Sequence, residues 1–498
     1  MAENDPTRRE VLLAMAGALL LDGSVNAQAS ADSICYMSAL EMARLIRAGK
    51  LSAREALAAH MKRIELVNPK VNAIVTLVAE MAAEAAAKAD EMQAHKETLG
   101  PLHGLPVAHK DLLETRGIRT TFGSLLFKDY VPTEDNIVVD RMRRAGAIII
   151  GKTNTPEFGA GSQTFNKVFG ATHNPYDLTK TCGGSSGGAA VSLACGFAPV
   201  VSGSDTGSLR NPAAFCNVVG FRPSIGRVPN PKAAFAWLTL STSGCLGRSV
   251  ADLAFVLSTI AGPDSRAPLS IAEPGEHFAR PLDRSFKGVR IAWFKDLGGV
   301  PFDARVRTVV DSHRKTFESL GCIVEQAEPD FADAETSFRV LRAWNSANAY
   351  GAQLKDHPDA FKDTLKGEIE EGLRLTGTDL ARAETAHGRM WRRFQAFLEK
   401  YEYFVLPTTQ LPPFDVNTPY PTEIAGVKFT NYIDWMKSCW YISATGNPAA
   451  SVPGGFTPEG LPVGVQIVGR DKADFTVLQM AHAFEQATGF GKKRPALA

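Results

Sequence analysis

The spacing of hydrophobic residues changes character along this chain of 498 residues. Residues 39–53, 54–66 and 79–95 carry apolar side chains at helical spacing, which predicts a helical N-terminal region. From Gly100 to about Gly262 the apolar residues gather in short runs between Gly, Ser and Thr, such as "PVAHK" at 106–110. Short buried runs that alternate with helical stretches predict an α/β sheet.

The second half of the chain changes pattern again. Residues 265–400 are more polar and helical, apart from "GVRIAWF", and strand patterns return at 402–409 and in "GLPVGVQIVG". We find no linker, repeat or low-complexity tract. We therefore predict an α/β fold with a large mixed β-sheet core between helices. The single domain at 31–498 would comprise a core at about 100–262, a helical lobe at about 265–400 and a C-terminal part at about 401–490.

The N-terminus has the order of parts found in export signals. The pair Arg8-Arg9 precedes an apolar stretch from Val11 to Leu21, which is too short to span a bilayer, and Ala27-Gln28-Ala29 follows. An amphipathic first helix is the plainer alternative. We predict a twin-arginine signal peptide at 1–30, a route that carries folded proteins, and hence a periplasmic or secreted mature protein without a membrane anchor.

The composition of the chain argues against certain binding partners and against a zinc site. The net charge is +1, 21% of residues are charged and no long basic run occurs, so nothing indicates a nucleic acid or a membrane surface as partner. The seven cysteines are scattered without a C-x-x-C pair. This argues against a zinc site, and we expect most of them to be buried apolar residues.

The tetrapeptide "DTGS" at 205–208 matches the motif that carries the catalytic carboxylate of aspartic proteases. That chemistry requires two carboxylates that share a proton. The chain has no second D-T-G or D-S-G, and it is far too long to be the half-size subunit of a protease dimer. Asp205 is therefore not expected to be a protease carboxylate.

A second candidate is "GGSSG" at 183–187, which fits the G-x-S-x-G pattern of a nucleophile elbow. Such an elbow follows a hydrophobic strand, whereas the preceding "NPYDLTKTC" is polar and indicates a loop. This disfavours Ser185 as the nucleophile of a Ser-His-Asp hydrolase. The loop could also cradle a phosphate, but it lacks the lysine of a Walker A loop, and a loop without chemistry is the remaining alternative.

Lys110 ends the apolar run "PVAHK". A solvated lysine is the simpler interpretation of this position, but burial would disfavour the ammonium form. A neutral lysine can act as a base towards a serine hydroxyl. The chain offers such serines in the Ser-Gly loop, at Ser185 and Ser186, and at Ser208 in a strand-to-helix turn.

These stretches together resemble the amidase signature family. The resemblance rests, in order, on "GPLHGLPVAHKD", "GAIIIGKTNTPEFG", "NPYDLTKTCGGSSGG", "GSDTGSLRNPAAFCNVVGFRPSIGRVP" and "GNPAASVPGGFTPEGLPVGVQIVG", from about Gly100 to Gly469. It implies an amidase that hydrolyses a small carboxamide, acyl or aryl amide through an acyl-enzyme. It implies no metal and no organic cofactor, and it leaves a homodimer open.

The resemblance also assigns roles to residues. The family uses a Ser–cis-Ser–Lys triad, which maps onto Ser208 as nucleophile, Ser185 as the bridging serine after a cis peptide bond, and Lys110 as base. Asp205 would brace the turn by pairing with Arg210. The oxyanion would be held by backbone N–H groups near Thr206, Gly207 and Ser208.

One departure concerns the turn before the nucleophile. The family pattern D-x-G-G-S is one glycine longer than the sequence from Asp205 to Ser208. The turn could re-form with fewer residues, the missing residue could displace Ser208 or remove an N–H donor and cripple activity, or this chain could be a deletion variant. We expect the second outcome, so that inserting a glycine after Gly207 would raise kcat about tenfold.

Two further inferences remain open. The alternative function is a non-catalytic or partner-dependent subunit, similar to the glutamine-hydrolysing subunit of tRNA-dependent amidotransferases. We expect the substrate pocket to be formed by residues 120–135, 340–400 and 410–445, which would favour an apolar acyl or aryl group. The aromatic residues that suggest such a group are Phe122, Phe127, Trp344, Trp391, Trp435, Trp440 and Tyr441, although aromatic residues more often belong to a core.

Overall fold

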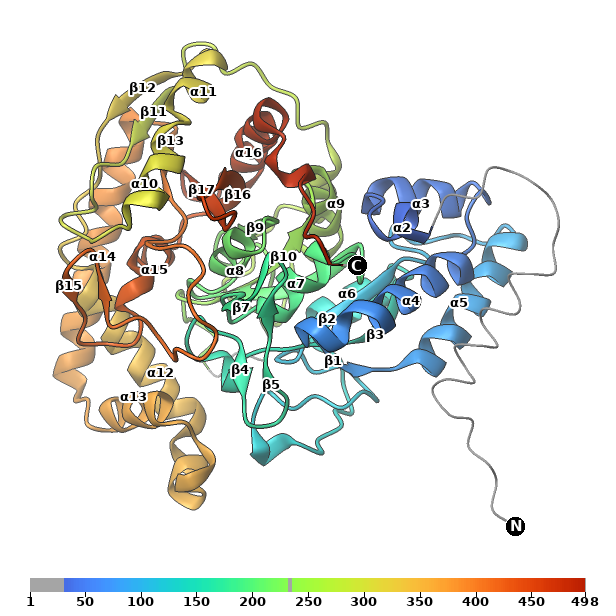
Figure 1. The fold of residues 1–498 in the computed structure, drawn as a ribbon. Coiled ribbons are helices and arrows are strands. Elements are labelled where there is room, and N and C mark those ends of the chain that lie inside the picture. The colour runs from blue at the N-terminus through green and yellow to red at the C-terminus, as the bar shows by residue number, and fades with distance from the viewer. Residues whose placement is uncertain (1–30, 232–234, 498) are drawn as a thin grey trace.

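A computed structural model describes residues 31–231 and 235–497, and the export signal expected at 1–30 lies outside the described residues. An eleven-stranded sheet runs through the molecule in the order β1-β3-β2-β8-β10-β9-β16-β17-β13-β11-β12 (Figure 1). Its strands are β1 (Ile74–Leu77), β2 (Pro106–Lys110), β3 (Ile148–Thr153), β8 (Val200–Asp205), β9 (Val219–Arg222), β10 (Thr242–Gly247), β11 (Arg290–Trp293), β12 (Ile323–Gln326), β13 (Tyr403–Pro407), β16 (Ala449–Phe456) and β17 (Pro462–Gly469). The sheet is mixed, because β2 runs parallel to both β3 and β8 while β10 runs antiparallel to β8. The predicted α/β class with a large mixed sheet is confirmed.

Helices cover both faces of this sheet. Successive strand residues point to opposite faces, and Val107 and Ala108 of β2 accordingly belong to two separate hydrophobic clusters. The helices are α2 (Ala31–Cys35), α3 (Ala39–Arg47), α4 (Ala53–Val71), α5 (Ala79–Ala94), α6 (Ile137–Arg144), α7 (Gly187–Ala194), α8 (Arg210–Phe215), α9 (Val250–Ile260), α10 (Ala304–Asp311), α11 (Arg314–Ser319), α12 (Ala334–Asp356), α13 (Asp363–Leu373), α14 (Gly377–Lys400), α15 (Lys437–Thr445) and α16 (Asp474–Thr488). The Val107 cluster includes side chains from α3, α6, α9 and α16, and the Ala108 cluster includes side chains from α4, α5 and α7.

Local sequence explains where several helices begin. Ser52 caps α4 and Thr376 caps α14, and in each the acidic residue three positions later, Glu55 or Asp379, bonds back to the cap backbone. These reciprocal bonds satisfy N–H groups that the first turn of a helix leaves free. They fix where α4 begins in the N-terminal helical region and where α14, the last helix of the helical lobe, begins.

The segment at 265–400 is not helical throughout. Helices α12, α13 and α14 form a layer at one end of the molecule (Figure 1), but β11 and β12 of the main sheet precede them. Of these two strands, "GVRIAWF" indicates only β11. The expected loop before the Ser-Gly motif also differs, because Asp177–Thr181 forms β7, paired with β6 (His173–Asn174). This hairpin is separate from the main sheet and partly exposed, which explains its polar sequence.

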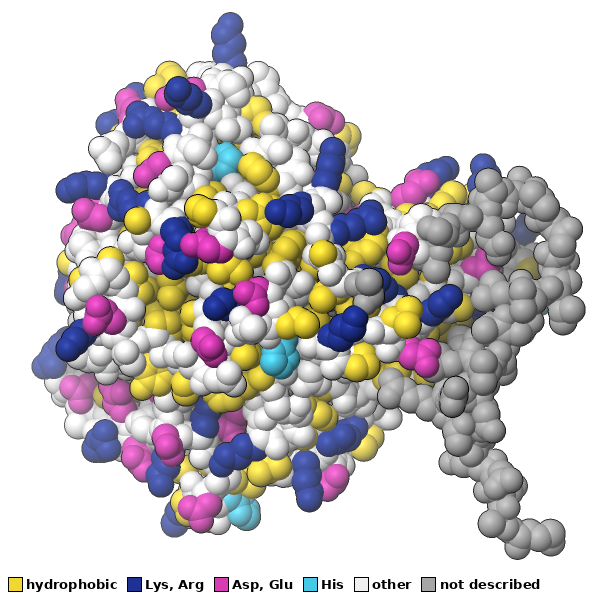
Figure 2. All heavy atoms as spheres, in the orientation of Figure 1, with side chains coloured by type: hydrophobic (Ala, Val, Ile, Leu, Met, Phe, Trp, Pro, Cys, Tyr) yellow, Lys and Arg dark blue, Asp and Glu magenta, His cyan; other side chains and the backbone are white. Residues whose placement is uncertain are grey.

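The visible surface carries both signs of charge. Figure 2 shows Lys and Arg side chains interspersed with Asp and Glu over the face that it draws, as a net charge of +1 would suggest. Among the described residues, no helix is both long enough and apolar enough to cross a membrane. All seven cysteines lie in the described part of the chain, where each is buried and unpaired with another.

Candidate active site

The ends of two neighbouring strands bring the candidate residues together. Lys110 is the last residue of β2 and Asp205 the last of β8, and these strands run side by side in the same direction. The C-terminal ends of parallel neighbours lie at the same edge of a sheet. Ser185 and Ser186 reach this edge because they immediately precede α7, which packs against β2 and β8.

Three predicted side chains form a continuous line of polar contacts. The Nζ atom of Lys110 lies 2.6 Å from the Oγ atom of Ser185. The Oγ atom of Ser185 lies 2.9 Å from the Oγ atom of Ser208. Ser185 therefore stands between the lysine and the second serine, in the bridging place that the family resemblance implies. The peptide bond between Gly184 and Ser185 is cis, as that resemblance also implies.

The environment of Lys110 favours its neutral form. The side chain is fully buried, and burial lowers the pKa of Lys110 from 10.5 to about 7, although the charge of Asp205 opposes this shift. Its Nζ atom also lies 3.0 Å from the hydroxyl oxygens of Ser186 and Ser204. A lysine with this pKa exchanges a proton with its neighbours near neutral pH.

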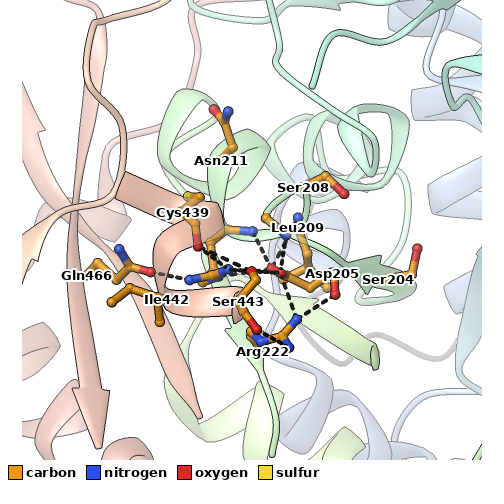
Figure 3. A network of polar contacts seen from close by, with 12 residues as sticks. Ser204, Asp205, Ser208, Leu209, Asn211, Arg222, Cys439, Ile442, Ser443 and Gln466 are labelled. Atoms are coloured by element: carbon orange, nitrogen blue, oxygen red, sulfur yellow. Dashed lines mark hydrogen bonds and ion pairs between the residues drawn. The ribbon is translucent and has the colours of Figure 1, made fainter. Parts of the chain in front are cut away.

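Asp205 has a structural place rather than a reactive one. Its carboxylate is fully buried and accepts hydrogen bonds from Arg210 Nε at 3.0 Å and Nη2 at 2.9 Å (Figure 3). The guanidinium of Arg222 lies 3.4 Å from the same carboxylate and donates to the Asp205 carbonyl oxygen at 2.7 Å. Burial alone would raise the pKa of Asp205, but these two arginines hold it well below its ordinary value. The expected pairing of Asp205 with Arg210 is confirmed.

The network around Asp205 extends to the C-terminal part of the chain. Arg210 donates to the Cys439 carbonyl at 3.0 Å, to the Ser443 hydroxyl at 2.5 Å and to the side-chain oxygen of Gln466. Figure 3 shows the Ser208 side chain directed away from this network. The Asp205 carboxylate therefore holds the turn in place through this network, while the Ser208 hydroxyl points away from it and contacts Ser185.

The backbone donors of the turn differ in part from our expectation. The N–H group of Gly207 donates to the Asp205 carboxylate at 2.6 Å and is therefore not available to an oxyanion. Among the described residues, no acceptor faces the N–H groups of Thr206 and Ser208. These two N–H groups are the free donors beside the Ser208 hydroxyl.

The shortened turn closes with the residues that it has. Gly207 adopts a φ of +111°, a backbone conformation that glycine tolerates and other residues resist. A Cβ atom at this position would lie 3.1 Å from the Met436 side chain and 3.2 Å from that of Trp440, so the turn is also tightly enclosed. Because Ser208 still contacts Ser185, the structure supports the re-formed turn and not the displaced serine.

Other candidate chemistries find no support in this geometry. No histidine among residues 31–231 and 235–497 bonds to Ser185 or Ser208, and the ring of the nearby His109 contacts Ser202 at 3.1 Å instead. A search of the same residues finds no group of three His, Cys, Asp or Glu side chains placed to hold a metal ion. The site has the parts for serine–lysine chemistry.

Three residues of the site were not identified from the sequence, whereas Ser186 was already a candidate partner of Lys110. Ser204 adjoins Asp205, but that adjacency alone did not place it beside Lys110. Arg222 and Ser443 carry no local signal, because the fold brings them to Asp205 from 17 and 238 positions away.

The expected aromatic residues divide between the core and the surface. Trp435 and Trp440 are fully buried, and Trp391 is 40% exposed. Phe122 and Phe127 are half-buried and contact each other at a ring distance of 5.2 Å. Trp344 stacks on Phe235 with ring centroids 4.2 Å apart.

Comparisons with known proteins identify the family of this chain. The protein-family model described as amidase matches residues 55–478. An acylamidase from Rhodococcus erythropolis is 37% identical over 469 residues, covering 93% of this chain and 98% of the relative. A glutamyl-tRNA(Gln) amidotransferase subunit from Moorella thermoacetica is 36% identical over 489 residues, covering 93% of this chain and 99% of that protein.

Solved structures of two amidases also superpose on most of this chain. A bacterial aryl acylamidase of the amidase signature enzymes superposes with a TM-score of 0.86 at 27% identity, covering 92% of this chain and 97% of the other. The peptide amidase from Stenotrophomonas maltophilia superposes with a TM-score of 0.75 at 26% identity, covering 93% and 98% of the two chains. The extent of these matches, together with the order of the motifs, shows that the chain belongs to the amidase signature family.

Proposed function

We propose that Lys110, Ser185 and Ser208 form the catalytic triad with which this amidase cleaves the carbon–nitrogen bond of a small amide. The observation that carries the proposal is the unbroken line of contacts from Lys110 Nζ through Ser185 Oγ to Ser208 Oγ, at 2.6 and 2.9 Å. Both distances suit proton transfer along the line. The lowered pKa of Lys110 provides the base at its end.

Acylation then proceeds with a balanced set of proton transfers. Neutral Lys110 accepts the hydroxyl proton of Ser185, and Ser185 accepts that of Ser208. The Ser208 oxygen forms a bond to the amide carbonyl carbon, and the carbonyl oxygen becomes an oxyanion. Lys110 is left as an ammonium ion.

Collapse of this intermediate releases the amine. The carbon–nitrogen bond breaks, and the nitrogen keeps the electron pair and takes a proton from the Ser185 hydroxyl, which is replenished from the Lys110 ammonium. Water then attacks the Ser208 ester and loses its proton to Lys110 through Ser185. The ester bond breaks, Ser208 recovers its proton along the same route, and the carboxylic acid leaves.

The oxyanion is held by the N–H groups of Thr206 and Ser208. Neither N–H group donates to another acceptor among the described residues. Removing one such donor typically costs about 3–4 kcal/mol of transition-state stabilisation. Asp205 supports these donors indirectly, because it ties Gly207 and Arg210 at either side of Ser208.

The substrate we propose is an acyl or aryl amide, in keeping with the acylamidase and aryl acylamidase relatives. The amidotransferase subunits are nearly as similar in sequence, so hydrolysis of glutamine is the second candidate. Purified protein should be screened for release of ammonia or amine from acetamide, benzamide, acetanilide and glutamine. Hydrolysis of glutamine alone would favour the second candidate, and inactivity towards all four amides would refute the proposed function.

We also propose that the mature protein is exported. The support is the order of Arg8-Arg9, the apolar stretch and Ala27-Gln28-Ala29, all outside the described residues. N-terminal sequencing of protein from the cell envelope should begin near Ala31. An intact Met1 on the exported protein would contradict the proposed cleavage.

A further inference from the structure

Asn211 is a fully buried residue near the nucleophile whose side chain takes no part in the chemistry described above. It lies in α8, three positions after Ser208, and its side chain points away from the Asp205 network (Figure 3). Its Nδ2 atom lies 2.8 Å from the Oγ atom of Ser162, which in turn lies 2.5 Å from the carbonyl oxygen of Gly184. We call this line of contacts the Asn211–Ser162 bridge. It joins the helix that follows the nucleophile to the residue before the bridging serine.

The direction of each hydrogen bond in the Asn211–Ser162 bridge follows from the chemistry of its members. A carbonyl oxygen can only accept, so the Ser162 hydroxyl donates its one proton to Gly184. The Ser162 oxygen then accepts from the Asn211 amide, whose Nδ2 atom must face it. The Oδ1 atom of Asn211 consequently faces elsewhere, and it has no hydrogen-bond partner among residues 31–231 and 235–497.

The unpartnered oxygen makes Asn211 unfavourable for stability. A buried polar atom that gives up its hydrogen bond to water without gaining another destabilises the folded state. A leucine of similar volume would fill the same space without this loss. Packing therefore gives no reason for an amide at position 211, whereas a required hydrogen bond to Ser162 does. Such departures from a fully satisfied core are expected at functional sites.

The Asn211–Ser162 bridge and a backbone hydrogen bond hold Ser185 from both sides. On one side, the N–H group of Ser186 donates to the Ser208 carbonyl at 3.1 Å. On the other side stands Gly184, which has no side chain that could anchor it. The Gly184 carbonyl accepts from Ser162, and no other donor in the described part of the chain contacts that oxygen. Both neighbours of Ser185 are therefore tied to the segment that carries Ser208.

We propose that Asn211 and Ser162 are positioning residues that hold the Ser185 hydroxyl at the distance from Ser208 that proton transfer requires. The inference rests on the proposed function, because it uses the role given to Ser185. The two hydroxyl oxygens lie 2.9 Å apart, and a proton passes between them in both acylation and deacylation. A displacement of about 1 Å at a reacting group can cost about a hundredfold in rate. In this role neither Asn211 nor Ser162 exchanges a proton with the substrate.

The first test replaces Asn211 by leucine, which keeps the approximate volume of the side chain and removes the amide. The assay uses whichever of acetamide, benzamide, acetanilide and glutamine the wild type hydrolyses fastest. We expect kcat to fall about 10- to 100-fold and KM to change less than about threefold. We expect Tm to stay equal or to rise, because the substitution also removes the unpartnered oxygen. A residue that served only the fold would show a fall in Tm instead.

Asn447→Leu is the matched control for this substitution. Asn447 is also fully buried, but both halves of its amide are satisfied, by Gln395 and by the Gly469 carbonyl at 2.9 Å each. It does not contact the catalytic triad. Asn447→Leu should therefore lower Tm and leave kcat within about threefold of the wild type, which is the opposite of the result expected for Asn211→Leu.

A second variant tests whether Asn211 acts through Ser162. Ser162→Ala removes a single oxygen atom and should lower kcat at least as much as Asn211→Leu does. Both substitutions interrupt the same bridge, so the double variant should lose less than about threefold beyond Ser162→Ala alone. Independent effects would instead multiply.

The outcomes separate this inference from the proposed function. Wild-type kcat in either single variant, a change in KM alone, a fall in Tm in Asn211→Leu or multiplied losses in the double variant would overturn the inference while the amidase function stands. A wild type inactive towards all four amides would overturn both. If Asn211→Leu does not fold, Asn211→Ala takes its place in the kinetic comparison with Ser162→Ala, with the same expected loss of kcat.

Discussion

Replacing Asp205 by asparagine removes the negative charge that faces two buried guanidinium groups. Arg210 and Arg222 are both fully buried, and both contact this carboxylate. Asparagine has nearly the same shape and could still accept one hydrogen bond, so the substitution isolates the charge from the packing. Its effect should therefore report what the buried ion pairs contribute to the fold and to the turn that carries Ser208.

The expected loss in the free energy of unfolding of Asp205→Asn follows from the burial of the ion pairs that Asp205 forms. Removing one partner of a buried ion pair costs about 3–5 kcal/mol, because the other charge is left uncompensated. The entropy of unfolding is about 2.1 cal/mol/K per residue, or about 1 kcal/mol/K for a chain of this length. We therefore expect Asp205→Asn to lower Tm by about 3–5 °C, as measured by calorimetry or circular dichroism.

Activity should fall as well, although Asp205 does not touch the substrate. Its carboxylate fixes the Gly207 N–H at 2.6 Å, and displacing a reacting group by about 1 Å can cost about a hundredfold in rate. We expect kcat on a good amide to fall about 10- to 100-fold with a smaller change in KM, because the turn acts on the transition state.

A matched variant separates the two effects. Asp474 is also fully buried and accepts hydrogen bonds from Arg227 at 3.1 Å and from the Ser224 N–H at 2.7 Å, but it does not contact the Ser208 turn. Asp474→Asn should lower Tm and leave kcat within about threefold of the wild type. Wild-type Tm and kcat in Asp205→Asn, or an equal loss of kcat in Asp474→Asn, would refute the bracing role of Asp205.

The remaining predictions concern the base and the turn. Lys110→Ala should abolish amide hydrolysis while the circular dichroism spectrum stays that of a folded protein, and full activity in this variant would exclude the lysine–serine relay. Because Lys110 acts in its neutral form and its pKa is lowered to about 7, kcat/KM should rise about tenfold from about pH 6 to about pH 8 and then level off; a profile that is flat across this range would contradict a base with that pKa. Inserting a glycine between Gly207 and Ser208 should lower kcat about tenfold or more, the reverse of the expectation from family spacing, since the closed turn already brings Ser208 within 2.9 Å of Ser185. A rise in kcat on insertion would show that the short turn is a defect.

Local pattern and motif order in the sequence were enough to predict several features of this protein. The apolar run at 106–110 predicted β2 with Lys110 at its end, because a strand buried on both faces must be apolar along its length. The late strands at 403–407 and 462–469 were visible for the same reason. The family motifs then assigned Lys110, Ser185 and Ser208, which the fold brings into contact.

The surroundings of these residues depend on the tertiary fold. The spacing of residues in the sequence showed that the turn before Ser208 is one residue short, but it did not show how this turn closes. Closure depends on Asp205 and on the side chains of Arg222 and Ser443, which come from β9 and α15. Nor did the spacing indicate that Ser204 would reach Lys110 across 94 positions. Hydrophobic periodicity reports which face of an element is buried, whereas strand order and register determine what that face meets.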